Sequence, residues 1–176
     1  AASDVYKRQR KGKVAELAHA LGHFEMTGTC GIGHTRWATH GKPSEANAHP
    51  HTSCSGDIAV VHNGIIENYI PLKEELQANG VVFRSETDTE VVAQLFDYLY
   101  DGDLVGTLIK VLHRIRGSYA LGILCTDYPD TLLAVRKDSP MIVGLGEHEN
   151  YIASDIPAVL DHTRKYYLCL LYTSPS

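Results

Sequence analysis

The order of apolar patterns along this 176-residue chain predicts an α+β fold. Amphipathic helical patterns fill the middle of the chain, and a run of short β patterns separated by tight turns follows them. Short strands joined by tight turns are typical of antiparallel sheets. We therefore expect helices packed together on antiparallel sheet, with no internal repeat and no linker between domains.

The first third of the chain predicts one short helix and two strands. A helical pattern runs from Val14 to His23 and ends near Gly22. The stretch GIGHTRW (31–37) predicts a strand that leads into a polar loop. DIAVVHNGII (57–66) has the β-branched density of a buried strand, and the turn signal Asn63-Gly64 predicts that this strand is interrupted.

Three further segments have helical signals. NYIPLKEELQANG (68–80) predicts a helix that stops at Asn79-Gly80, with a proline in its first turn. Thr87, followed three residues later by Glu90, predicts a capping box at the start of the next helix. The third pattern begins near Asp103 and runs to Arg116.

The remaining sequence predicts four strands. Their patterns cover 117–127, 131–138, 141–146 and 150–155. Proline, aspartate, serine and asparagine residues separate them, as expected for tight turns.

Composition narrows the function classes. The formal net charge of −5 argues against a nucleic-acid surface, and the basic run from Lys7 to Lys13 is typical of a solvated terminus. No apolar run approaches the roughly 18 residues of a membrane span. The four cysteines form no CxxC pair, so we expect reduced thiols and a cytoplasmic protein.

The two ends of the chain differ from its middle. Residues 1–9 and 169–176 do not continue the periodicity of their neighbours. We expect them to be foreign, adaptor-derived tails around a domain that covers residues 10–168.

Cys30 and a cluster of histidines are candidates for chemistry. An extended strand separates Cys30 from His34 by about 13 Å, too far for a thiol and its base, so a small core residue is the preferred interpretation. Several histidines raise the question of a metal site, among them His49 and His51. No spacing typical of zinc ligands is present, and we expect no metal.

Three other sets of residues have two interpretations each. Arg36 beside Trp37 is consistent with a site that binds a carboxylate. The alternative is that Arg36 forms a surface ion pair and Trp37 packs in the core. Asn63 and Gly64 suit an oxyanion hole, or a hairpin turn for which no return strand follows. Asp88 suits a bound ammonium group, or compensation of a helix dipole.

Four motifs carry a resemblance to a known family. HTRWATHG, NAHPH, HNGIIENY and SETDTE, in this order and spacing, resemble the glutaminase domain of the glutamine–fructose-6-phosphate aminotransferases, which are class II glutamine amidotransferases. The resemblance extends from about Lys13 to Leu168. His40 favours this family over the phosphoribosylpyrophosphate amidotransferases, which carry a Tyr-Ser-Thr type of sequence at the matching place.

The resemblance implies an N-terminal-nucleophile fold, an αββα sandwich of antiparallel sheets. It implies that Arg36 and Asp88 hold the two charged groups of glutamine and that Asn63 and Gly64 form the oxyanion hole. Further residues are implied to line the site or to contact a neighbouring domain, namely Trp37, Thr39 and His40 for the site and His49 for the contact. No cofactor is implied.

The resemblance also implies a cysteine nucleophile at the mature N-terminus. We expect this cysteine and the first strand to be missing here, because Cys30-Gly31-Ile32 imitates the nucleophile motif too close to Arg36. A truncated, inactive glutaminase domain is therefore expected. Its implied partners are glutamine, the sugar-phosphate isomerase domains, fructose 6-phosphate and a second copy joined through those domains.

Three alternatives stay open from the sequence. One is a glutamine-binding module that never had a nucleophile. Another is a different class II amidotransferase, such as a phosphoribosylpyrophosphate amidotransferase relative. The third is a metallohydrolase with histidine ligands, which would contain bound zinc.

Overall fold

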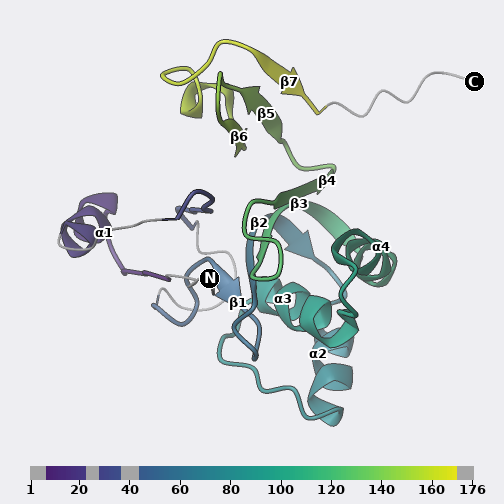
Figure 1. The fold of residues 1–176 in the computed structure, drawn as a ribbon. Coiled ribbons are helices and arrows are strands. Elements are labelled where there is room, and N and C mark those ends of the chain that lie inside the picture. Colours follow the sequence, from purple (N-terminus) through teal and green to yellow (C-terminus); the bar gives the residue numbers. More distant parts are fainter. Residues whose placement is uncertain (1–6, 23–27, 37–43, 170–176) are drawn as a thin grey trace, which may run out of the picture.

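The computed structural model describes residues 7–22, 28–36 and 44–169. It contains helices and two antiparallel sheets, which confirms the predicted α+β class (Figure 1). The first sheet has the strand order β1-β2-β3-β4 and is formed by His51–Thr52, Ile58–Ile66, Gly117–Cys125 and Leu132–Lys137. The second has the order β6-β5-β7, with β5 at Ile142–Leu145, β6 at Asn150–Ala153 and β7 at Tyr166–Leu168.

Three helices pack together on one face of the first sheet (Figure 1). They are α2 (Tyr69–Ala78), α3 (Asp88–Leu99) and α4 (Leu104–Arg114). The short helix α1 (Val14–Leu21) lies apart from them and buries no residue. A single 3₁₀ turn, η1 (Ile156–Ala158), follows β6.

The core lies between α3 and the two central strands. Val91, Val92 and Phe96 of α3 have no exposed surface, and they belong to one apolar cluster with Val60 of β2 and Leu121 of β3. Burying apolar side chains of this size stabilises the fold by about 1.5–3 kcal/mol each. This cluster therefore fixes α3 against the sheet.

The pleat of β2 sends neighbouring side chains to opposite faces. Val60 joins the helical core, whereas Val61 lines a cavity on the other face, toward the second sheet. The same alternation directs His62 to Thr89 at the start of α3 and directs Asn63 to His34. Two adjacent residues thus reach two different parts of the structure.

Two sequence predictions about strands are wrong. Residues 31–36 are extended but pair with no strand in the described part of the chain. The Asn63-Gly64 pair does not interrupt β2, which continues to Ile66. Both residues pair with β3, Asn63 opposite Ala120 and Gly64 opposite Tyr119, so sheet pairing overrides the local turn signal. Strands β1 and β7 were not predicted.

The predicted capping box is also wrong. Thr87 is the N-cap residue of α3, but its side chain caps no backbone N–H. Its hydroxyl instead pairs with His51 Nε2 at 3.0 Å. The Glu90 carboxylate accepts the backbone N–H groups of Arg84 and Ser85 at 2.8 and 2.6 Å. The Glu90 carboxylate therefore satisfies N–H groups of the loop before α3 and does not cap the N-terminus of α3.

The other helix predictions agree closely with the structure. The helix predicted at 68–80 is α2, which ends at Ala78 before Asn79 and Gly80. The helix predicted from Asp103 is α4, where the Asp103 side chain accepts the Gly106 N–H at 3.0 Å. None of the helices in the described part of the chain is long and apolar enough to cross a membrane.

Gly117 should tolerate no side chain. Its φ is +118°, and an added Cβ would lie 2.1 Å from the Ile65 carbonyl oxygen. We expect Gly117→Ala to lower the free energy of unfolding by about 3 kcal/mol, from left-handed strain plus overpacking. Gly80 also has a positive φ but open space around it, so Gly80→Ala should cost only about 1 kcal/mol. Urea unfolding measures both, and equal costs would contradict the close approach of β2 and β3 at this point.

Candidate functional site

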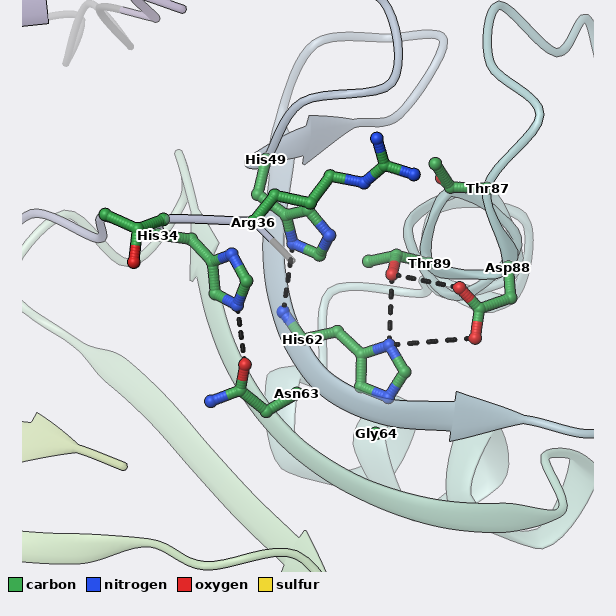
Figure 2. A pocket seen from close by; sticks show the side chains of 10 residues that line it. His34, Arg36, His49, His62, Asn63, Gly64, Thr87, Asp88 and Thr89 are labelled. Atoms are coloured by element: carbon green, nitrogen blue, oxygen red, sulfur yellow. Dashed lines mark hydrogen bonds and ion pairs between the residues drawn. The ribbon is translucent and has the colours of Figure 1, made fainter. Parts of the chain in front are cut away.

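A cavity of about 230 Å³ lies where the start of α3 meets β2 and the extended segment 31–36. Polar side chains from these three parts of the chain, together with His49, surround it (Figure 2). Its lining residues are His34, Thr35, Arg36, His49, His62, Asn63, Gly64, Thr87, Asp88 and Thr89.

Four of the residues predicted to bind glutamine or to form the oxyanion hole line this one cavity, and His49, predicted at a domain contact, lines it too. Arg36 belongs to the extended segment, Asn63 and Gly64 belong to β2, and Asp88 is the first residue of α3. Their convergence agrees with the expectation from sequence. Trp37, Thr39 and His40 lie outside the described residues.

Asp88 is held in place by the protein around it. The residue is 7% exposed, and its Oδ2 accepts the backbone N–H of Ile66 at 2.8 Å. Its Oδ1 lies 3.5 Å from the Thr89 hydroxyl. An ionised carboxylate has about four acceptor positions, so Asp88 retains capacity for a further donor from the cavity.

His62 lies beside this carboxylate. Its Nδ1 pairs with the Thr89 hydroxyl at 3.0 Å and lies 4.0 Å from Asp88 Oδ2. Burial lowers the pKa of His62, and the nearby Asp88 charge opposes that effect only in part. Because its pKa is lowered, His62 lies beside Asp88 as a neutral ring and does not offset the charge of the carboxylate.

Four histidines form a cluster at the edge of the cavity. The His34 and His49 rings stack with centroids 4.2 Å apart, and the edge of His51 meets His49 at 5.0 Å. The His49 Nδ1 accepts the backbone N–H of His62 at 3.2 Å. Burial, reinforced by the neighbouring histidines, lowers the pKa of His49 to about 2. Burial also lowers the pKa of His51 to about 4.

This cluster has a structural arrangement rather than the arrangement of metal ligands. Its ring nitrogens bond to a backbone N–H, to the Thr87 and Thr89 hydroxyls, and to the Asn63 side chain. Among the described residues, no group of three or more histidine, cysteine, aspartate or glutamate side chains has the geometry to hold a metal ion.

Asn63 and Gly64 have the donors that an anionic oxygen would require. The Asn63 Oδ1 is 2.6 Å from His34 Nε2, so its Nδ2–H₂ group points away from that ring (Figure 2). Gly64 has a φ of +129°, and a Cβ there would lie 2.1 Å from the Ser118 carbonyl oxygen. Only glycine fits this position.

A model of the glutamine amidotransferase domain matches residues 18–167. The chain belongs to the glutamine amidotransferase family. This membership confirms the resemblance seen in the four sequence motifs.

Several relatives of this amidotransferase domain are known. It is 61% identical over 160 residues to a glutamine–fructose-6-phosphate aminotransferase of Caldanaerobacter subterraneus, covering 91% of this chain and 26% of the relative. It is 57% identical over 164 residues to that of Clostridium tetani, covering 93% and 27%. The chain thus spans about a quarter of the length of these relatives.

A solved relative supports the fold. A glutamine phosphoribosylpyrophosphate amidotransferase from B. subtilis superposes with a TM-score of 0.62 at 26% identity. The match covers 74% of this chain and 29% of that one. The predicted N-terminal-nucleophile class of fold agrees with this likeness.

A second cavity of the amidotransferase domain adjoins the first. It measures about 530 Å³ and lies between the two sheets, lined by Val61 and Gly122 on one side and Ile152 on the other. The two cavities share four lining residues, namely His34, Thr35, His62 and Asn63. Asn63 therefore lies at the boundary between the two cavities.

None of the four cysteines, all of them free and all among the described residues, lines either cavity. Burial raises the pKa of the Cys30 thiol, and the Asp130 carboxylate adds to that rise. A reactive cysteine needs the opposite, a lowered pKa. Cys30 thus lacks both the place and the ionisation of a nucleophile.

Sequence reasoning missed two hydroxyl groups of the site. Thr87 and Thr89 flank Asp88 and bond to His51 and His62. The alternation Thr-Asp-Thr at a predicted helix start was the available signal. Threonine at a helix start also predicts capping, so this signal does not separate the two roles.

The histidine cluster should make stability depend on pH. His49 and His51 have folded pKa values of about 2 and about 4, below the usual 6.5, so below pH 6.5 the unfolded chain binds more protons. Stability is then present above pH 6.5 and is lost as the pH falls toward 4. In this window each histidine should change the free energy of unfolding by about 1.4 kcal/mol per pH unit.

Urea unfolding between pH 7.5 and pH 5 measures this slope. His51→Asn should reduce the slope of the free energy of unfolding against pH by the contribution of one histidine, because asparagine does not titrate. A slope that this substitution leaves unaltered would contradict the neutral, buried state of His51.

Proposed function

We propose that the cavity at the start of α3 binds glutamine and that this domain is the glutaminase part of an amidotransferase. One observation carries the proposal: a cationic and an anionic side chain, Arg36 and Asp88, line the same small cavity as Asn63 and Gly64. An amino acid with a carboxamide side chain requires groups of these kinds.

Arg36 and Asp88 are proposed to bind the charged end of glutamine. The planar guanidinium of Arg36 matches the α-carboxylate with two parallel hydrogen bonds. Asp88 has acceptor capacity for the α-ammonium group, and Ile66 holds its carboxylate in a fixed orientation. The buried environment strengthens both contacts.

The carboxamide of glutamine is proposed to extend past Asn63 toward the cavity between the sheets. The lining that the two cavities share at His34 and Asn63 supports this path. The Asn63 Nδ2–H₂ and the Gly64 backbone N–H then donate to the oxygen on which negative charge develops.

The relatives suggest the context of this reaction. They are named glutamine–fructose-6-phosphate aminotransferases, and we propose that this domain supplies ammonia for the amination of fructose 6-phosphate in a longer protein. The expected isomerase domains, their dimer contact and the role of His49 at the domain boundary belong to this proposal. Within the domain, His49 is buried in the histidine cluster.

A second function, binding without catalysis, is favoured by one specific observation. None of the four cysteines lines the cavity, so the described residues contain no thiol placed to attack a bound carboxamide. A glutamine-binding module would need only the charged contacts.

Glutamine binding tests both functions. Isothermal titration of the purified chain should show that L-glutamine binds and D-glutamine binds more weakly. Arg36→Ala should weaken the binding of L-glutamine roughly ten- to hundredfold, because a charge-assisted pair of hydrogen bonds is lost. Asp88→Asn should weaken it as well, since the amide keeps the shape but not the charge.

Two variants serve as controls. Arg116→Ala removes an exposed arginine that does not line the cavity, and binding should be unchanged. Asn63→Ala should have little effect on binding, because its donor acts mainly in the transition state. If Arg36→Ala bound glutamine as tightly as the unaltered chain, the proposed contact would be wrong.

Glutamine hydrolysis separates the two functions. The chain itself should show none above background, and a chain extended with a family-type N-terminal segment that begins Cys-Gly-Ile should hydrolyse glutamine. In the extended chain Arg36→Ala should mainly raise KM. Asn63→Ala should mainly lower kcat, by about 10²–10³.

Cys30→Ala is the matched control in the extended chain and should leave the rate unchanged. A rate that required Cys30 would assign the nucleophile to that residue instead. Binding without hydrolysis in the extended chain would favour the non-catalytic module.

A further inference from the structure

We propose that His34 is a positioning residue that fixes which way the Asn63 carboxamide faces. This inference deepens the proposed function and rests on it, because it concerns the oxyanion donor of that reaction. The observation is the short contact of 2.6 Å between His34 Nε2 and Asn63 Oδ1 (Figure 2).

The carboxamide of asparagine has two ends with opposite properties. Its oxygen only accepts hydrogen bonds, and its nitrogen only donates them. An Asn63 side chain turned over about its terminal bond would direct its oxygen to a developing oxyanion and repel it. A fixed orientation is therefore required for a donor in an oxyanion hole.

The contact also determines the tautomer of His34. Because Asn63 Oδ1 is an acceptor, the hydrogen of a neutral His34 ring resides on Nε2. The His34 Nδ1 is then a bare acceptor, and it is buried without a hydrogen-bond partner among the described residues. The reversed arrangement would bury an Nδ1–H donor without an acceptor, which costs more.

The His34 ring itself is held by its neighbours. It stacks on His49 with an angle of 20° between the ring planes. His49 is anchored to β2 through its bond from the His62 N–H, and β2 also carries Asn63. The chain of contacts thus returns to β2, the strand that carries Asn63.

This role is separate from any contact of His34 with glutamine. The argument requires only that His34 donates to Asn63 Oδ1, so the Asn63 nitrogen stays available. His34 therefore acts through Asn63 and not on the substrate.

Nuclear magnetic resonance of the 176-residue chain tests this inference directly. The ¹⁵N shifts of the His34 ring should show a protonated Nε2 and a bare Nδ1 near neutral pH. The Asn63 side-chain amide should give one pair of proton signals, without cross-relaxation to the His34 ring. In Asn63→Leu, which has no acceptor, the preference of His34 for one tautomer should be lost.

Two substitutions of His34 provide the comparison. His34→Leu removes the donor, and the Asn63 amide should lose its single orientation, seen as a second pair of signals or as line broadening. His34→Gln keeps a nitrogen donor on a side chain of similar reach and should restore one pair of signals. His113→Leu, on the exposed surface of α4, is the matched control and should leave the Asn63 signals unchanged.

The outcomes divide clearly. A His34 ring protonated on Nδ1, or Asn63 signals that His34→Leu leaves unchanged, would overturn the inference. If His34→Leu does not fold, the tautomer of the unaltered chain and its change in Asn63→Leu still decide the question. Absence of glutamine binding with the expected tautomer present would refute the proposed function and leave the orientation of Asn63 established.

Discussion

The hydrogen bond from the Ile66 backbone N–H to the Asp88 carboxylate joins the two elements on which the rest of the structure depends. Ile66 ends β2, a central strand of the first sheet, and Asp88 begins α3, the helix at the centre of the core. The bond is buried and charge-assisted, so it is stronger than an ordinary backbone contact. It ties the strand that carries Asn63 and Gly64 to the helix start that carries Asp88.

A cluster of histidines, of which burial keeps His49 and His51 neutral, completes this unit at its other edge. Histidines commonly charge near neutral pH, but burial keeps the pKa of His49 and of His51 far below that range. The His51 Nε2 can then pair with the Thr87 hydroxyl, and the His49 Nδ1 can accept the backbone N–H of His62. The cluster thus orients polar groups without adding a positive charge that would compete with Arg36 for a carboxylate.

The agreement between sequence and structure depends on the range of the interactions involved. The helices at 69–78 and 104–114 follow from patterns within each segment, and the structure contains them nearly as predicted. The Asn63-Gly64 turn signal is equally local, yet β3 pairs with both residues and keeps the strand continuous. Nine paired positions along β2 and β3 outweigh the preference of one dipeptide.

The sequence by itself determined the α+β class, the helices of the core and the four residues that gather at one cavity, because periodicity and motif spacing are properties of the chain. Only the tertiary structure decided how those residues are held. Thr87 bonds to His51 across 36 positions rather than capping its own helix, and His34 reaches Asn63 across 29. Such partners meet only after β2 and α3 pack, and no local pattern encodes which of several available hydroxyl or imidazole groups will lie within 3 Å.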